Sequence, residues 1–331
     1  MTRNKTVFDT HIETHLSSIF IELEKASPEL KHQWKLMAEA MLYPVSAGGK
    51  RVRPHIVKLM AEALGAPENH EAVTMAGCSI ELVHTYSLVH DDLPCMDNDD
   101  FRRGRPTAHK IYGDANALLI GDALLTEAFS LMTKLQEKNV PSTYIVQCIE
   151  KLSRFAGLRG MVAGQWLDLA FEQDNGNAHW PALATIHNLK TGALLSASFS
   201  VGALLGTALS AATTSRVFNE PKERELIRKA ESIGQQAGLA FQLIDDILDS
   251  SQSSEKLGKT AGKDRAQGKL TAISLLGLDE AKRLAVQLTE SCLSSMSELS
   301  SIASTHPNLS VSKSKFDALN HFIGELLERT S

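Results

Sequence analysis

Apolar residues recur every three or four positions along most of the chain, which is the spacing of one face of an α-helix. The clearest run lies between residues 226 and 248. Its apolar positions are Leu226, Ala230, Ile233, Ala237, Ala240, Ile244 and Leu248. Similar spacing predicts helices over residues 8–25, 30–42, 50–64, 71–92, 114–135, 142–155, 180–212, 278–299 and 313–328. Alternating β-branched runs are few, so the pattern indicates an all-α protein.

Short segments rich in Pro, Gly, Ser or Asn separate these runs. They lie at Pro44–Gly49, Gly65–Asn69, Asp174–Asn177, Thr213–Pro221, Ser250–Ser254 and His306–Ser310. None is as long as an interdomain linker, and the chain has no internal repeat. With 331 residues and 43% hydrophobic content, it can bury one large core. We therefore predict a single domain over residues 1–331, built as a bundle of about ten or more helices.

Charge and cysteine content narrow the classes of protein to consider. The net charge is −5 and there is no basic tail or stripe, so a nucleic-acid partner is not indicated. The four cysteines form no C-x-x-C pair, and free thiols fit a reducing compartment. The N-terminal sequence MTRNKTVFDTHIETH lacks the apolar stretch of a secretory signal. We expect a cytoplasmic protein.

Residues 192–212 contain no charged residue and reach the length of a membrane span. Ala, Gly and Ser dominate this segment, however, so its hydrophobicity is only moderate. Lys190 lies just before it and Arg216 soon after it. Small residues would let neighbouring helices approach closely. A buried helix inside the bundle is therefore favoured over a transmembrane span, and we expect the protein not to cross a membrane.

One acidic cluster, in the sequence DDILD, comprises Asp245, Asp246 and Asp249. On a helix, positions four apart lie about 40° apart around the axis, so Asp245 and Asp249 share a face. The same face continues backwards through Gln242, Gly238 and Gln235. A stripe that faces solvent would normally carry Lys and Glu, whereas Gln, Gly and Asp suit the wall of a polar cavity.

The other acidic cluster is HDDLPCMDNDD, residues 90–100. Asp91 shares a helix face with Ser87 and His84, at spacings of four and three. Pro94 then disfavours continued helix. Asp97 follows Asp91 by six residues, which would not align on a regular helix. We expect a local distortion at the proline to bring Asp97 back beside Asp91.

The two clusters lie 154 residues apart and are predicted to form facing walls of one cavity. Hard divalent cations prefer carboxylate oxygen, and Mg²⁺ typically takes one or two carboxylates together with waters and substrate phosphates. The pattern therefore predicts a Mg²⁺ site that holds a diphosphate. For either cluster alone, a solvated helix end is the alternative interpretation.

Basic residues suited to an anion lie in GGKRVRP, residues 48–54, where glycines precede three cations at a predicted helix start. A basic surface turn would look similar. Arg102 and Arg103 directly follow the first acidic cluster, where they either bind an anion or neutralise the aspartates. Further isolated candidates are Lys190–Thr191, Lys259 and Lys269, although each lysine taken singly is more often a plain surface lysine.

The combination of GGKRVRP, HDDLPCMDNDDFRRGRPTAHK, LKTGALL and DDILD resembles the trans-prenyl diphosphate synthases, specifically the bacterial-type farnesyl and geranylgeranyl diphosphate synthases. The match runs from about residue 43 to about residue 276. These motifs are long and specific in combination. The resemblance implies an isoprenoid-synthase-type bundle of helices around a deep central cavity, usually in a homodimer.

The resemblance also implies the reaction. An allylic diphosphate ionises to a carbocation, isopentenyl diphosphate attacks it, and loss of a proton gives a longer allylic diphosphate. Three Mg²⁺ ions, with Mn²⁺ as an alternative metal, stabilise the departing diphosphate. The expected partners are therefore isopentenyl diphosphate and allylic diphosphates.

Site residues follow from the resemblance position by position. The implied metal ligands are Asp91, Asp92, Asp97, Asp245, Asp246 and Asp249. The implied contacts to the allylic diphosphate are Arg102, Lys190, Thr191, Gln242 and Lys259. Of these, Lys190, Thr191 and Gln242 are also placed to stabilise the cation. The implied isopentenyl diphosphate site is Lys50, Arg53, His84 and Arg103. Lys269 resembles a lysine near the cavity mouth, but Leu270–Ile273 departs from the family's usual Thr-Tyr-Pro after that lysine.

Product length is implied by Tyr86 and Ser87, just before the first acidic motif. Tyr86 lies five residues before Asp91, hence about 7.5 Å along the helix, where a bulky ring would close the floor of the cavity. In the family this favours a C15 product, farnesyl diphosphate. Ser87 is small, so some C20 product is expected, and ordinary core packing is the alternative role for Tyr86.

Other functions have less support. A geranylgeranyl diphosphate synthase is the nearest alternative. A terpene cyclase normally pairs one aspartate-rich motif with an Asn/Ser/Glu triad and would not need GGKRVRP. A non-catalytic regulatory subunit typically loses one acidic motif, whereas this chain has both.

Overall fold

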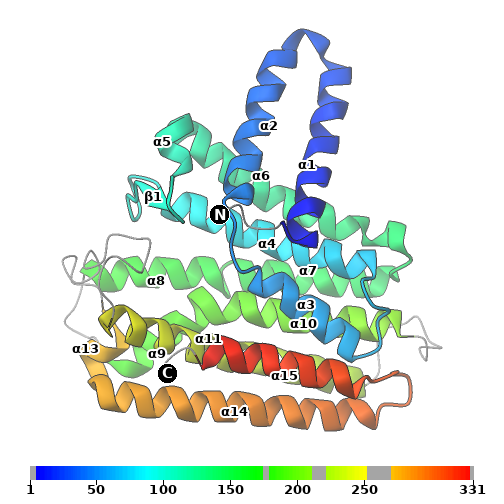
Figure 1. Cartoon of the computed structure of the whole chain (residues 1–331), viewed down its shortest axis with the longest axis vertical. Coiled ribbons are helices and arrows are strands. Elements are labelled where there is room, and N and C mark those ends of the chain that lie inside the picture. Colours follow the sequence, from blue (N-terminus) through cyan, green and yellow to red (C-terminus); the bar gives the residue numbers. More distant parts are fainter. Residues whose placement is uncertain (1–4, 174–178, 211–220, 252–269, 329–331) are drawn as a thin grey trace. The chain divides into compact units, whose positions relative to one another are not determined.

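The structure is a computed structural model that describes residues 5–173, 179–210, 221–251 and 270–328 (Figure 1). Helices dominate the described residues, whose one sheet is the two-stranded ribbon β1 (Phe101–Arg102) and β2 (Arg105–Pro106). The all-α prediction is confirmed. Backbone contacts divide the chain into two compact units, Met1–Pro54 with Thr74–Leu135 and His55–Val73 with Gln136–Ser331. The predicted site residues Lys259 and Lys269 lie outside the described residues.

The first unit begins with a pair of antiparallel helices and continues with two further long helices, with shorter elements between them (Figure 1). Its elements are α1 (Val7–Ala26), η1 (Pro28–Leu30), α2 (Lys31–Ser46), most of α4 (Glu71–Asp91), β1, β2, α5 (Ala108–Tyr112) and α6 (Asp114–Thr133). Helix α1 starts at a capping box, because the Thr6 hydroxyl accepts from the Asp9 amide and the Asp9 carboxylate accepts from the Thr6 amide.

The second unit packs long helices around α10 and α11. Its elements are α3 (Val52–Ala63) from His55 onward, η2 (Lys134–Lys138) from Gln136 onward, α7 (Ser142–Ala156), α8 (Met161–Gln173), α9 (Trp180–His187), the π-helical turn η4 (Asn188–Gly192), α10 (Ala193–Leu209), α11 (Pro221–Ser251), α13 (Ala272–Leu276), α14 (Leu278–Ser304) and α15 (Lys313–Leu327). Helix α10 packs on α7 and α11, and α11 also packs on α14.

Two described helical segments are long and apolar enough to cross a membrane by length and composition, Asp114–Lys138 and Trp180–Leu209. The apolar window of the second is 89% buried within the protein. Close helix packing explains its small residues, because a Cβ on Gly202 would lie 2.8 Å from the Val57 carbonyl oxygen. The segment is therefore a core helix, as its composition indicated.

The long helices follow the apolar pattern, and the short helices α5 and α13 were not predicted. Three other differences are informative. Helix α2 continues through Pro44 to Ser46, where the pattern predicted a break. Its last turn is held from outside, because the Tyr43 hydroxyl donates to the Pro106 carbonyl oxygen and the Val45 carbonyl oxygen accepts from Arg51. These contacts compensate for the hydrogen bond that a proline removes.

The second difference is α8, for which no helix was predicted. Its apolar residues Val162 and Trp166 face solvent, and Trp166 is 76% exposed, while Gly164 is buried. Apolar residues on the outer face obscure the usual amphipathic pattern. The third is the ribbon β1–β2, whose two-residue loop, Arg103–Gly104, has positive φ at both positions. That is the backbone of a type I′ hairpin turn.

Candidate functional site

The first acidic motif forms a compact loop at the end of α4. Helix α4 ends at Asp91, and the Asp97 amide donates to the Asp91 carbonyl oxygen at 2.8 Å. The Asn98 amide donates to the Leu93 carbonyl oxygen, and Asn98 itself has φ of 48°. The predicted distortion that brings Asp97 back to Asp91 is confirmed.

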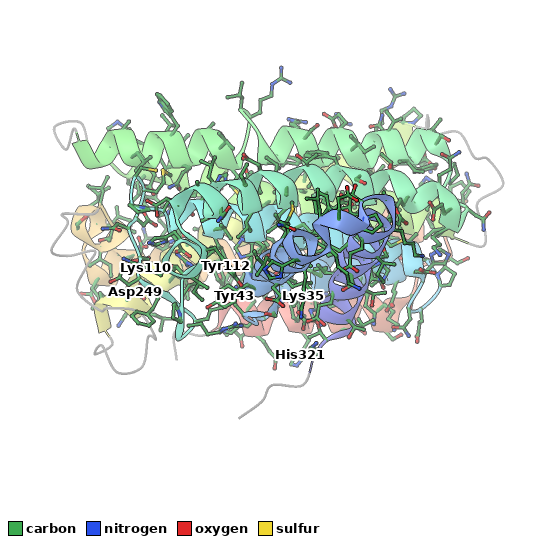
Figure 2. All side chains as sticks on the ribbon, turned by 90° about the horizontal axis from the view of Figure 1, so that it is seen from above. Lys35, Tyr43, Lys110, Tyr112, Asp249 and His321 are labelled. Atoms are coloured by element: carbon green, nitrogen blue, oxygen red, sulfur yellow. The ribbon has the colours of Figure 1, made fainter. Side chains whose placement is uncertain are left out.

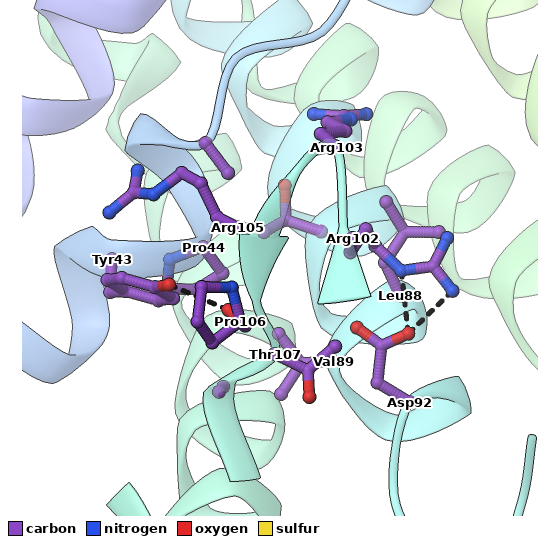
Figure 3. Close-up of a pocket in the computed structure, with 13 residues that line it drawn as sticks. Tyr43, Pro44, Leu88, Val89, Asp92, Arg102, Arg103, Arg105, Pro106 and Thr107 are labelled. Carbon is purple, nitrogen blue, oxygen red and sulfur yellow. Dashed lines mark hydrogen bonds and ion pairs between the residues drawn. The ribbon is translucent and has the colours of Figure 1, made fainter. Parts of the chain in front are cut away.

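Asp92, the second aspartate of the motif, is held by an arginine. It is only 4% exposed, and Nε and Nη2 of Arg102 both lie 2.6 Å from its Oδ1 (Figure 3). Burial raises the pKa of Asp92, and the Arg102 guanidinium opposes this rise without cancelling it. Asp92 therefore orients Arg102 in this structure, and its role as a metal ligand stays a prediction.

The hairpin turn places Arg103 over the glycines of GGKRVRP. Nη1 of Arg103 donates to the Gly48 carbonyl oxygen. A Cβ on Gly49 would lie 2.6 Å from that same nitrogen. Gly49, with φ of 136°, has a backbone conformation that favours glycine, and the Arg103 guanidinium lies against it.

Three of the four residues predicted to bind isopentenyl diphosphate, Arg53, His84 and Arg103, come together in the first unit. Burial lowers the pKa of Arg53, with Arg103 lowering it further and Glu81 opposing. Burial also lowers the pKa of His84 well below its usual value, and Arg53 and Arg103 act in the same direction. His84 is therefore neutral beside arginines, an arrangement suited to an anion. Lys50, the fourth residue, is exposed.

The remaining cation of GGKRVRP, Arg51, has a different role. It is 3% exposed, its Nε donates to Asp9 and its Nη1 to Glu81, each at 2.7 Å. Its Nη2 donates to the Val45 carbonyl oxygen at 2.5 Å. Arg51 thus ties the start of α3 to α1, α2 and α4, and the sequence pattern could not separate it from its neighbours.

Lys190 and Thr191 lie in the π-helical turn η4 between α9 and α10. Such turns frequently occur at functional sites. Two glycines hold the turn closely: a Cβ on Gly164 of α8 would lie 2.2 Å from the Lys190 amide nitrogen, and one on Gly238 of α11 would lie 2.3 Å from Gly192 Cα. Neither position has room for a side chain.

Side chains from the same two helices hold the side chains of the turn. Thr191 Oγ1 donates to Gln242 Oε1 at 3.0 Å, so Thr191 and Gln242 come together as predicted. Lys190 Nζ donates to Asp168 Oδ2 at 2.6 Å. Asp168 was missed by the sequence reasoning, although its spacing of four residues from Gly164 puts both on one face of α8.

The second acidic motif lies on the last turns of α11. Asp246 Oδ2 accepts from the Ala272 amide at 2.8 Å, at the start of α13. Thr271 caps α13, which gives the departure at Leu270–Ile273 a structural role. Asp245 is half-buried and Asp249 is exposed (Figure 2).

The carboxylates fit Mg²⁺ chemically, because that ion takes hard oxygen ligands and completes its shell with water and phosphate. Within the residues that the structure describes, no group of three or more His, Cys, Asp or Glu side chains is assembled as a metal site. The first motif belongs to the first unit and the second motif to the second unit. That the two motifs face each other stays a prediction.

Tyr86, the predicted floor residue, is 6% exposed. Burial raises its pKa to about 12, with a further contribution from Asp91. Its ring packs edge-on against His90, with centroids 5.7 Å apart. His90 in turn lies against Gly121 of α6, where a Cβ would be 2.0 Å from Nε2. The Ser87 hydroxyl donates to the His84 carbonyl oxygen, one turn below.

A pocket in the first unit lies along a different face of α4, that of Thr85, Leu88 and Asp92 (Figure 3). Its lining residues are Tyr43, Pro44, Ala47, Thr85, Leu88, Val89, Asp92, Arg102, Arg103, Arg105, Pro106, Thr107 and Ala108. The Tyr43 ring packs edge-on against Tyr112, and the Arg105 guanidinium lies 4.2 Å from its centroid. The pocket is therefore rich in arginine and borders Asp92 on the side of the hairpin.

Comparison with known proteins gives consistent results. The polyprenyl synthetase family model matches residues 34–304. A farnesyl diphosphate synthase of Geobacillus stearothermophilus is 42% identical over 272 residues, which cover 82% of each chain. A heterodimeric geranylgeranyl pyrophosphate synthase large subunit 2 of Arabidopsis thaliana is also 42% identical, over 86% of this chain and 70% of that one. For three other Arabidopsis relatives the match spans only 62% to 65% of their length.

Among solved structures, a geranyltransferase of Helicobacter pylori, complexed with magnesium and isoprenyl diphosphate, superposes with a TM-score of 0.71. It is 30% identical, and the match covers 99% of both chains. The motifs, the fold and these matches agree with one another. The chain therefore belongs to the polyprenyl synthetase family, as a member of its trans-prenyl diphosphate synthases.

Proposed function

We propose that the protein is a farnesyl diphosphate synthase. It condenses isopentenyl diphosphate with dimethylallyl or geranyl diphosphate, and releases diphosphate at each step. The allylic C–O bond breaks to leave a cation and diphosphate, and the double bond of isopentenyl diphosphate attacks the cation. A proton then leaves to the departed diphosphate, which gives a new allylic diphosphate.

The observation that carries the C15 product is Tyr86. Its ring is buried, lies five residues before Asp91, and is backed by His90, which packs against Gly121. A rigid aromatic ring at this depth would limit the chain that can grow beside α4. Because His90 packs against the Tyr86 ring, the ring is displaced less easily by a growing prenyl chain.

The described residues support distinct tasks for the two substrates. Arg53, His84 and Arg103 would hold the diphosphate of isopentenyl diphosphate, with Lys50 at the exposed edge. Lys190 and Arg102 would hold the allylic diphosphate. Because Thr191 directs its hydroxyl proton to Gln242 Oε1, the lone pairs of the Thr191 oxygen remain available to stabilise the allylic cation.

The aspartates would supply the metal ligands, with Asp91, Asp97 and Asp245 the leading candidates and Asp92, Asp246 and Asp249 completing the two motifs. Mg²⁺ bound there, in three ions as the family resemblance implies, neutralises diphosphate charge and so makes it a better leaving group. Lys259 and Lys269 remain candidates for contacts with the diphosphates.

The test is incubation with Mg²⁺, isopentenyl diphosphate and either dimethylallyl or geranyl diphosphate, followed by mass analysis of the product. We expect C15 from the unaltered protein and a shift to C20 or longer from Tyr86→Ala. An unchanged C15 product from Tyr86→Ala would remove Tyr86 as the floor. A cyclic hydrocarbon, or no reaction, would overturn the proposed synthase activity itself.

A geranylgeranyl diphosphate synthase is the second candidate, because relatives such as the one from Capsicum annuum, at 45% identity, carry that name. In the same assay, C20 as the main product of the unaltered protein selects this function. We also propose a cytoplasmic homodimer. Exposed Leu118 and Leu119 on α6 support the dimer, because large apolar side chains on the surface favour a protein partner.

A further inference from the structure

The π-helical turn η4 is held in the same way from two helices. On α11, Gly238 contacts the backbone of the turn, and Gln242, four residues later, holds the Thr191 side chain. On α8, Gly164 contacts the backbone, and Asp168, four residues later, holds the Lys190 side chain. A spacing of four keeps each glycine and its polar partner on one helix face, so α8 and α11 hold the turn in the same arrangement.

We infer that Asp168 is a positioning residue for Lys190 and sets the geometry in which Lys190 meets the allylic diphosphate. This inference rests on the proposed function, in which Lys190 contacts that diphosphate. Asp168 acts through Lys190 and touches no reacting atom itself.

The geometry of the ion pair supports this role. A lysine ammonium has three donors on a flexible stem of four carbons, and ordering such a side chain costs entropy. Asp168 fixes one donor at 2.6 Å, and the backbone beneath Lys190 is fixed by Gly164. The other two donors are then directed before a diphosphate arrives, which lowers the ordering cost at the moment of reaction.

A purely structural ion pair is the competing explanation, and the second unit contains a suitable control. Lys151 and Glu231 form a pair of 2.9 Å whose side chains are each 14% exposed, whereas those of Lys190 and Asp168 are 29% and 22% exposed. The more buried pair lies outside η4. Glu231→Gln removes that pair and the 3.9 Å contact of Glu231 with Arg154 without touching the turn, while Lys151 keeps its pair with Glu150 at 3.0 Å.

The test is a double-mutant cycle on Asp168→Ala and Lys190→Ala, with steady-state rates measured for both substrates. We expect Asp168→Ala to lower kcat about 10- to 100-fold, with KM for isopentenyl diphosphate within about twofold of the unaltered value. In the Lys190→Ala background the same change should alter kcat by no more than about twofold. Asp168→Asn, whose amide oxygen still accepts a hydrogen bond, should lose less than Asp168→Ala.

Glu231→Gln should leave kcat and both KM values unchanged. An equal loss of kcat from Asp168→Ala in both backgrounds, or the same loss from Glu231→Gln, overturns the inference. Circular dichroism and thermal unfolding confirm that each variant folds. If Asp168→Ala does not fold, the cycle is run with Asp168→Asn, and the same outcomes decide.

Calorimetric binding of inorganic diphosphate in the presence of Mg²⁺ separates this inference from the proposed function. Asp168→Ala should weaken binding roughly fivefold, and should not weaken it further in the Lys190→Ala background. Equal weakening in both backgrounds, or tighter binding, contradicts the inference. If Asp168→Ala weakens diphosphate binding only when Lys190 is present, but the unaltered protein does not elongate prenyl chains, the role of Asp168 stands and the proposed synthase activity is overturned.

Discussion

The two candidate diphosphate sites differ in how they treat positive charge. In the first unit, Arg53, His84 and Arg103 lie together, and the imidazole stays neutral under the combined effect of burial and arginines. In the second unit, Lys190 is paired with Asp168 at 2.6 Å. In the first site the arginines act together to keep His84 neutral, whereas the second site holds a lysine–aspartate pair whose geometry is fixed in advance.

Two histidines, one in each unit, show the same contrast. Burial is the largest cause of the lowered pKa in both. At His84, the neighbouring arginines lower the pKa further. At His187, whose pKa falls to about 4, Asp168 raises the pKa and Lys190 lowers it, so the two members of the pair act in opposite directions. The comparison can be tested by disturbing the residues that support each site.

The largest expected effect is at Arg51, which supports the first site. Arg51→Met leaves the carboxylates of Asp9 and Glu81 without their arginine in a buried setting. Removing one partner of a buried ion pair typically costs about 3–5 kcal/mol of unfolding free energy. We expect a loss of this size in urea unfolding of the full chain.

Arg283→Met is the matched control for that change. Arg283 pairs with Glu280 on the surface of α14, where water compensates for a lost ion pair. The urea midpoint should stay unchanged. If Arg51→Met were no more harmful than Arg283→Met, the buried pairs would not organise the first site.

A smaller loss is expected at Gly238, which supports the second site. A Cβ there would lie 2.3 Å from Gly192 Cα, so Gly238→Ala forces α11 and the π-helical turn apart. Overpacking of this kind typically costs about 1–3 kcal/mol. It should also lower kcat, because Thr191 and Lys190 move with the turn, and urea unfolding with steady-state kinetics measures both.

Gly324→Ala is the control, because the nearest atom to its added Cβ is Glu328 Oε1 at 3.9 Å. In the helix α15 this change should raise stability by up to about 1 kcal/mol and leave kcat alone. A harmless Gly238→Ala would mean that the turn does not depend on close backbone contact.

Much of this organisation was readable in the sequence, and the remainder has identifiable physical causes. Periodicity predicted α11 and α4, and the proline in the first acidic motif predicted the return of Asp97 to Asp91. Spacing alone could not distinguish Arg51, which is buried, from Arg53, because both lie in the same basic run. That distinction depends on Asp9 and Glu81, which are distant in the sequence.

Helix α8 and Asp168 were missed for a related reason. Val162 and Trp166 face outward and Gly164 faces inward, so the apolar period does not mark the buried side. Gly164 contacts the backbone at Lys190, which is distant in the sequence, and no periodic pattern of residues marks such a contact. The departure at Leu270–Ile273 likewise became interpretable only through the bond from the Ala272 amide to Asp246.

The smallest expected effect is a pH dependence at His187. Its pKa is about 4 in the folded protein against 6.5 as the ordinary value, so below pH 6.5 the unfolded chain binds a proton that the folded chain does not. Stability is therefore lost as the pH falls from 6.5 towards 4. Between pH 7.5 and pH 5.5 this amounts to about 1 kcal/mol. In His187→Gln, urea unfolding should show a correspondingly smaller loss over that interval.

A parallel measurement on His84→Gln compares the histidine of the first site with His187 of the second. The pKa of His84 in the unaltered protein is also lowered. His84→Gln should therefore also reduce the loss of stability on acidification below pH 6.5. In an Arg103→Met background, however, one of the arginines that lower the pKa of His84 is absent, and the benefit of His84→Gln should shrink. The benefit of His187→Gln should not change, because Asp168 and Lys190 are its charged neighbours. Equal responses of the two histidines to Arg103→Met would mean that Arg103 does not keep His84 neutral in the first site.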